Sequence, residues 1–235
     1  MRFFIIALTL FLFSCKKDEP VSPVDFGNDY YPGKKGTYVI YHCDSTVYAD
    51  LNNNTEHYTF QIKEVIDSFF TDNNGKNAIR ISRFKKWLQY DTLSAVDTTW
   101  HIQDVWWGNV TASTVQIVEE NNRIVKLSFP VETGKTWKGN AYNILGDWDF
   151  EYLEVDVPFS IGNLYFPKTL HVNQYNSANI LIYHKKYDEK YAKGVGMIYK
   201  EIEDYTWKEN NGTIMTGVIK FGYHYIMNIT DYGTE

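Results

Sequence analysis

The residues best suited to bind a ligand are the tryptophans of the segment Trp100-His101-Ile102-Gln103-Asp104-Val105-Trp106-Trp107. An exposed tryptophan offers a large apolar ring with a polar N–H, which suits it to stack on a sugar or to hold a lipid. If the segment is a strand, alternation places Trp100 and Trp106 on one face and Trp107 on the other. We therefore consider Trp100, Trp106 and Trp107 as binding residues. The alternative is that they are core or barrel-rim residues of a tryptophan-rich protein.

A second stretch, Asp147-Trp148-Asp149-Phe150-Glu151-Tyr152, alternates acids with aromatic residues. Calcium needs six to eight converging oxygens, whereas a strand spaces residues of one face by about 6.8 Å. The pattern therefore predicts a solvated outer face backed by aromatic core residues. A glycan hydrolase needs two facing carboxyl groups, and this alternative stays open for pairs drawn from Glu119, Glu120, Asp147, Asp149 and Glu151.

The chain contains no motif for metal, serine-hydrolase or cysteine-based chemistry. The six histidines show no His-x-x-x-His pair, and no Gly-x-Ser-x-Gly elbow is present. Apart from Cys15, Cys43 is the only cysteine, so a cysteine-rich metal or redox site is excluded. We expect no catalytic residue, no metal site and no cofactor.

The N-terminal residues have the pattern of a secretory signal. Arg2 precedes a short apolar run from Phe3 to Phe13, too short to span a bilayer. The residues Leu12-Phe13-Ser14-Cys15 resemble the lipobox of bacterial lipoproteins, although Phe13 replaces the smaller residue usual there. The resemblance implies a signal peptide over residues 1–14, a lipid on Cys15, and a membrane partner. The expected location is the outer membrane, facing either the periplasm or the cell surface.

Composition limits the remaining choices. The chain has 235 residues and a net charge of −6 with no basic run, which argues against nucleic acid as a partner. Three prolines (Pro20, Pro23 and Pro32) follow the cysteine, so residues 15–32 are expected to form the lipidated cysteine and a flexible tether. No second linker appears, and residues 33–235 are expected to form a single all-β domain.

The strand signals predict an antiparallel meander of about a dozen strands. Alternating or β-branched runs occur at 37–41, 58–63 and 78–84, and the runs at 115–120 and 123–127 flank an Asn121-Asn122 turn. A second turn is predicted at Glu209-Asn210-Asn211-Gly212. The segments 64–70 and 84–90 could each hold a helical turn. A barrel, a half-barrel and a sandwich all fit this pattern.

The segment Tyr191-Ala192-Lys193-Gly194-Val195-Gly196-Met197-Ile198-Tyr199-Lys200-Glu201 resembles an element of uncharacterised secreted bacterial β-proteins. With the lipobox, the chain is similar to small envelope lipoproteins and, at the level of the fold alone, to the half-barrels of lipoprotein localisation factors. Three functions follow as hypotheses. They are a non-catalytic binding module for a lipid, glycan or peptide, a structural subunit of an envelope complex with a protein partner, and the glycan hydrolase above.

Overall fold

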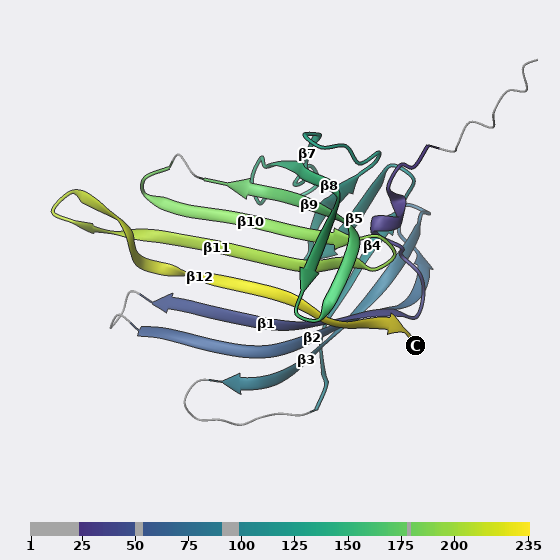
Figure 1. Cartoon of the computed structure of the whole chain (residues 1–235), viewed down its shortest axis with the longest axis horizontal. Helices are drawn as coiled ribbons and strands as arrows, with labels where there is room; N and C mark the ends of the chain where they lie inside the picture. The colour runs from purple at the N-terminus through teal and green to yellow at the C-terminus, as the bar shows by residue number, and fades with distance from the viewer. Residues whose placement is uncertain (1–23, 50–53, 91–98, 178–179) are drawn as a thin grey trace, which may run out of the picture.

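A computed structural model of the chain describes residues 24–49, 54–90, 99–177 and 180–235. These residues form one antiparallel sheet of twelve strands in the order β6-β5-β4-β3-β2-β1-β12-β11-β10-β9-β8-β7 (Figure 1). The strands are β1 (Thr37–Ala49), β2 (Asn54–Thr71), β3 (Asn77–Tyr90), β4 (His101–Val110), β5 (Thr114–Glu119), β6 (Asn122–Ser128), β7 (Thr136–Lys138), β8 (Asp149–Ile161), β9 (Leu164–Asn176), β10 (Tyr183–Ala192), β11 (Gly196–Asn210) and β12 (Thr213–Thr234). The predicted all-β class is confirmed.

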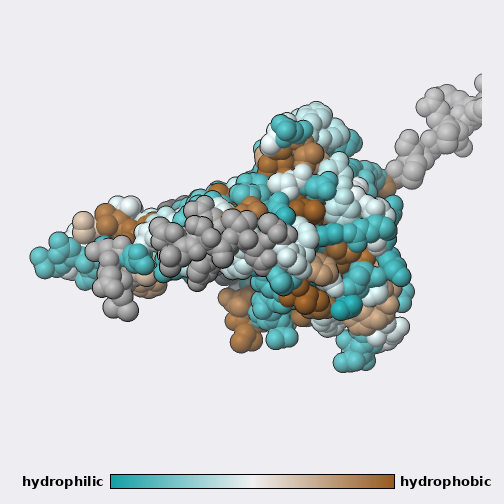
Figure 2. All heavy atoms as spheres, turned by 90° about the horizontal axis from the view of Figure 1, so that it is seen from below, coloured by the Kyte–Doolittle hydropathy of each residue, from teal (hydrophilic) through white to brown (hydrophobic). Residues whose placement is uncertain are grey.

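The sheet curls into a nearly closed barrel. Its two edges meet where β6 approaches the loop after β7: the Val125 N–H donates to the Gly139 carbonyl at 2.8 Å, and the Asn143 amide donates to the Arg123 carbonyl at 2.9 Å. In Figure 1, the hairpin of β8 and β9 crosses in front of the long strands β10–β12, against which its apolar residues pack. Figure 2 shows the result as a thick body that tapers to a thin arm at the β11–β12 turn. Of the three predicted architectures, the barrel fits best.

Helices contribute little to the described part of the chain. The one helical element there is a 3₁₀ turn, η1 (Asn28–Tyr30). No helix among the described residues has the length and apolar character needed to cross a membrane. The segments 64–70 and 84–90, where the sequence allowed helical turns, both lie within strands β2 and β3. That prediction was wrong because pairing with neighbouring strands decides the conformation of such short segments.

The two predicted hairpin turns are present at or within one residue of their predicted positions. Asn211 and Gly212 have φ values of 49° and 78°, and Asn210 pairs with Thr213 across them. Two central residues with positive φ are the geometry that matches the twist of a two-residue hairpin. The β5–β6 hairpin uses the same geometry, but its central residues are Glu120 and Asn121. The turn therefore begins one residue earlier than the sequence predicted.

The N-terminal boundary of the packed body lies earlier than predicted. Tyr30 is 0% exposed and belongs to the larger core cluster, and its hydroxyl donates to the Asp156 carboxylate at 2.7 Å. Tyr31 packs against the same cluster. The two aromatic rings bury too much apolar surface to stay in solvent, so the predicted tether cannot extend to residue 32. Cys15 and the signal segment lie outside the described residues.

At Gly222, strand β12 approaches β11 too closely for any side chain to fit. Gly222 pairs with Tyr48 of β1 and with Tyr205 of β11, and those two rings lie 5.7 Å apart in an edge-to-face contact. Its φ is +139°, and a Cβ built there would come within 2.0 Å of the Asp204 carbonyl oxygen. Only glycine satisfies both conditions at this position.

We predict that Gly222→Ala lowers the free energy of unfolding more than Gly217→Ala does. Gly217, on the same strand, also has positive φ (+88°) but has open space around it. The control therefore measures the conformational cost of about 1–2 kcal/mol alone, while Gly222→Ala adds about 1–3 kcal/mol of overpacking. Urea denaturation of both variants measures the difference. Equal losses would contradict the close approach at Gly222.

Candidate ligand-binding site in the barrel lumen

Four charged side chains meet inside the barrel, from strands at opposite parts of the sheet order. Lys126 Nζ lies 2.9 Å from Glu119 Oε1 and 2.6 Å from Glu189 Oε1. Lys200 Nζ lies 3.2 Å from Glu189 Oε1 and 3.9 Å from Glu119 Oε2. The other oxygen of Glu189 accepts a hydrogen bond from the Tyr191 hydroxyl at 2.6 Å. We call the group Glu119, Lys126, Glu189 and Lys200 the luminal ion cluster.

The luminal ion cluster is buried and electrically balanced. The side chains of Lys126 and Glu189 are 5% and 0% exposed. Burial alone would raise the pKa of Glu189, but the ammonium groups of Lys126 and Lys200 outweigh it and hold that pKa well below its usual range. The same two ammonium groups also lower the pKa of Glu119 against the effect of its burial. Both carboxyl groups are therefore ionised at neutral pH, and two positive charges offset two negative ones.

A β-bulge brings Lys126 into the lumen. Val115 pairs with Leu127 and Gln116 pairs with Val125, so Lys126 is the extra residue of β6. A bulge points two consecutive side chains to the same face, which here are Lys126 and the fully buried Leu127. Strict alternation would have placed Lys126 on the outer face.

A second ionic group lies beside the cluster. Arg83 of β3 pairs with Glu64 of β2 at 2.9 Å and with Asp104 of β4 at 3.2 Å. Its guanidinium carbon also lies 3.6 Å from the centre of the Trp106 ring, a cation–π contact. The Trp106 indole N–H is buried and has no hydrogen-bond partner among the described residues.

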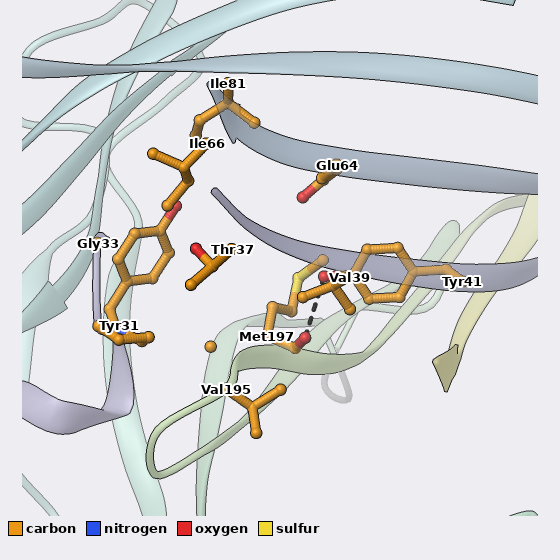
Figure 3. A pocket seen from close by; sticks show the side chains of 12 residues that line it. Tyr31, Gly33, Thr37, Val39, Tyr41, Glu64, Ile66, Ile81, Val195 and Met197 are labelled. Atoms are coloured by element: carbon orange, nitrogen blue, oxygen red, sulfur yellow. Dashed lines mark hydrogen bonds between the residues drawn. The ribbon is translucent and has the colours of Figure 1, made fainter. Parts of the chain in front are cut away.

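Cavities flank the luminal ion cluster on both sides. One has a volume of about 250 Å³ and reaches from Tyr31 and Trp106 to the cluster, and a second, of about 320 Å³, reaches from the cluster to Trp148 and Gln174. Both are lined by Glu119, Lys126, Lys200 and Ile202. A smaller cavity of about 50 Å³ adjoins the first at Tyr31, Glu64 and Met197, where the Tyr41 hydroxyl donates to the Met197 carbonyl at 3.0 Å (Figure 3).

The cavity of 320 Å³, which we call the amide cavity, contains two unsatisfied donors. Asn140 and Gln174 line it and are 7% and 6% exposed. Their side-chain amide nitrogens are buried and have no hydrogen-bond partner among the described residues. Leaving a buried donor unpaired costs about 1–3 kcal/mol. A bound molecule with acceptor atoms would remove this cost.

The three tryptophans considered as binding residues lie in three different environments. Arg83 pairs with Asp104 and Phe84 pairs with Ile102, so Gln103 is an extra residue that reverses the alternation. Trp106 faces the lumen, whereas Trp107 packs near Phe70 and Arg123 on the outer face. Trp100 lines a shallow pocket with Ser82 and Phe84. The prediction that Trp100 and Trp106 share a face was wrong, and Trp106 alone of the three lines the luminal cavities.

The five carboxylates considered for catalysis do not share one environment. Glu120 is exposed in the β5–β6 turn, and Glu151 is half-buried on β8. Asp147 and Asp149 are exposed and share the Lys138 ammonium at 2.9 and 3.0 Å, as expected for a solvated face. Trp148, Phe150 and Tyr152 turn inward to the core, as predicted. Glu119 lies in the lumen, but its pKa is lowered, whereas the general acid of a glycosidase needs a raised pKa.

Histidines and acids alternate on the outer face of β10–β12. Ligand atoms of Glu201, Glu203 and His224 lie within 4.8 Å of one another. Glu201 already accepts from Lys186 at 2.8 Å and lies 3.1 Å from His224, while Glu203 lies 2.7 Å from His184. Each carboxylate thus has a partner, and we interpret the group as a ladder of surface ion pairs.

The residues that build the luminal site carried almost no sequence signal. Lys126 stands between Val125 and Leu127, and Glu189 stands in a polar run of β10. A charged residue inside an apolar strand could have been noticed, but the position of the bulge and the partner strand could not be read from spacing. Asn140 and Gln174 look like ordinary loop and strand residues.

The fold and site define an all-β barrel protein with a buried cluster of charged residues in its lumen. No protein-family model matches the chain, and no curated protein matches it significantly. Two solved structures are remotely similar. One is a "putative exported protein with YmcC-like fold" from Bacteroides fragilis, with a TM-score of 0.43, 8% identity, and coverage of 88% of this chain and 100% of that one. The other is a "putative lipoprotein" from Parabacteroides distasonis, with a TM-score of 0.38, 9% identity, and coverage of 90% and 100%.

We predict that Lys126→Met lowers the free energy of unfolding by about 3–5 kcal/mol, because it leaves Glu119 and Glu189 with one ammonium between them in a buried site. Lys138→Met is the matched control, since Lys138 also contacts two carboxylates but is 49% exposed. Its removal should cost at most about 1 kcal/mol. Urea denaturation at neutral pH gives both values, and similar losses would show that the luminal ion cluster is not desolvated.

The acid stability of the barrel should depend on Glu189. Its pKa in the folded state lies below the ordinary value of 4.5, so its ion pairs contribute fully above that pH and are lost as the pH falls through the folded-state pKa. The wild-type protein should therefore lose stability below about pH 4.5, and Glu189→Gln should show a flatter profile there. Unfolding free energies across this range test this, with Glu209→Gln at an exposed site as the control. A slope unchanged by Glu189→Gln would contradict the assignment.

Proposed function

We propose that the protein is a non-catalytic binding module of the cell envelope, and that its ligand occupies the barrel lumen. The observation that carries this proposal is the pair of cavities beside the luminal ion cluster, one of which contains unpaired amide donors. Ligand sites in proteins are mostly apolar hollows of about 300–1,000 Å³ with a few converging polar groups. The amide cavity, at about 320 Å³, matches that description in size and in the apolar character of Ile124, Leu145 and Phe150.

The cellular part of the proposal comes from the N-terminus. The lipobox-like Leu12-Phe13-Ser14-Cys15 supports acylation of Cys15 after removal of residues 1–14. An attached lipid would place the barrel at a membrane surface, which we propose to be the outer membrane. The described chain makes its first contacts with the barrel at Asp25, which pairs with Lys193, and at Phe26, whose carbonyl accepts from the Val131 N–H at 3.1 Å. A tether of roughly nine residues would therefore join the lipid to the barrel, with an average span of about 15–18 Å by the square-root rule.

A second candidate function, a subunit of an envelope complex, is favoured by apolar side chains on the thin arm of the molecule. Leu181 and Ile182, before β10, are 73% and 56% exposed, and Phe221 of β12 is 46% exposed. The Trp207 N–H donates to the Ile182 carbonyl at 3.2 Å, which joins these elements at the arm. Exposed apolar groups gathered at one end are typical of a surface that contacts another protein.

Native mass spectrometry of the full chain, extracted in detergent from the membranes of a Gram-negative host, tests both parts of the first proposal. We expect a covalent mass increase that survives denaturation, from acylation of Cys15, and a further mass that is lost on denaturation, from a ligand in the lumen. Ile202→Trp should reduce the second mass, because Ile202 lines both cavities and a larger side chain fills them.

The matched control for that variant is Ile226→Trp. Ile226 is also half-buried and lies on the neighbouring strand, but it pairs with Glu201 and Asp44 on the outer face. It should leave the bound mass unchanged, and circular dichroism confirms that both variants fold. Absence of any releasable mass would contradict luminal binding, and a mass lost equally in both variants would place the ligand elsewhere.

A further inference from the structure

We infer that the amide cavity binds an uncharged carbohydrate ring, held through its hydroxyl oxygens by Asn140 and Gln174 and packed against Trp148. This inference rests on the proposed function and selects one ligand class among the lipid, glycan and peptide that the sequence left open.

The free hydrogen-bonding groups of the cavity are neutral donors. The amide nitrogens of Asn140 and Gln174 are buried without a partner among the described residues. The Asn140 carbonyl oxygen accepts from the Asn143 amide at 3.1 Å, which fixes the orientation of the Asn140 side chain and leaves its nitrogen as the group without a partner. A ligand must therefore supply acceptor oxygens at two places. An acyl chain offers none, whereas each hydroxyl of a sugar offers two lone pairs.

The charged groups of the cavity are already neutralised by the protein. Lys126 and Lys200 share Glu119 and Glu189, and Lys185 pairs with Asp204 at 3.0 Å. The hydroxyl of Tyr187 donates to the same Asp204 carboxylate at 2.6 Å. An anionic or cationic ligand would have to compete with these close pairs or bring an uncompensated charge into a buried site. The cavity therefore favours an uncharged molecule over a phosphate, a free carboxylate or a peptide terminus.

The aromatic part of the wall suits a ring-shaped ligand. Trp148 lines the cavity and is held by two neighbours, with ring centroids 4.7 Å from Tyr175 and 4.9 Å from Tyr187. A rigidly held indole is an apolar platform that loses little entropy when a ligand packs on it. Sugars pack their C–H faces on such rings while their hydroxyls reach polar neighbours, which here are the two amides.

Saturation-transfer NMR of the full chain with a mixture of glucose, galactose, mannose and N-acetylglucosamine tests this inference. We expect transfer to at least one of these sugars in the wild-type protein. Gln174→Met keeps the length of the side chain but removes the donor, and should weaken binding by about tenfold or more. Gln61→Met, a half-buried glutamine on β2 that does not line the cavity, should bind as the wild type does.

Stability without ligand gives an independent measurement. Removing an unsatisfied buried donor relieves its desolvation cost, so Gln174→Met should unfold at a higher urea concentration than the wild type when no sugar is present. If Gln174 served only to stabilise the fold, its replacement would lower the urea concentration at which the protein unfolds. Weaker sugar binding together with a lower unfolding midpoint would assign Gln174 to folding and contradict the inference.

The outcomes separate this inference from the proposed function. No transfer to any sugar, together with a releasable lipid or peptide in native mass spectrometry, overturns the carbohydrate class but keeps luminal binding. No transfer and no releasable mass overturns both. Transfer that persists unchanged in Gln174→Met places the sugar at another site and overturns the assignment to the amide cavity.

Discussion

The barrel depends on the contact of Lys126 with Glu189 across its lumen. These two residues belong to β6 and β10, which are eight positions apart in the sheet order and meet only because the sheet curls. Hydrogen bonds at the edge, such as Val125 to Gly139, close the sheet at its rim, while the ion pairs hold its opposite walls together inside. A buried pair of this kind is costly to desolvate and strongly unfavourable to break. We therefore interpret the pair as a contact that fixes the curl of the sheet, and not as a large contribution to the total stability.

This closure explains why space remains in the interior. A barrel wall of aliphatic residues alone can pack until no void is left, whereas long charged side chains keep opposite walls apart at the distance their ion pairs require. Both larger cavities border the luminal ion cluster and share Ile202 as an apolar wall residue. The luminal ion cluster thus lies between the two cavities. The core clusters of buried hydrophobic residues supply the stability that this polar centre does not.

The sequence was sufficient for features that depend on local chemistry, and insufficient for those that depend on register. The strand alternation, the turn at Asn211-Gly212 and the inward direction of Trp148, Phe150 and Tyr152 are set by neighbouring residues and were predicted. Bulges at Gln103 and Lys126 were not, because an extra residue in a strand is defined by the strand opposite. Each bulge changes which face a side chain occupies. The bulge at Gln103 explains why Trp100 and Trp106 do not share a face as predicted, and the bulge at Lys126 explains why the luminal ion cluster was not predicted.

Charged and neutral polar side chains have different roles within the lumen. The charges on Lys126, Lys185 and Lys200 are each matched by a carboxylate of the protein, so they are part of the structure that holds the walls. The side-chain nitrogens of Asn140 and Gln174 make no hydrogen bond among the described residues and so add nothing to that structure. Under the proposed function, the acceptor oxygens of a ligand would be the partners of these two buried donors.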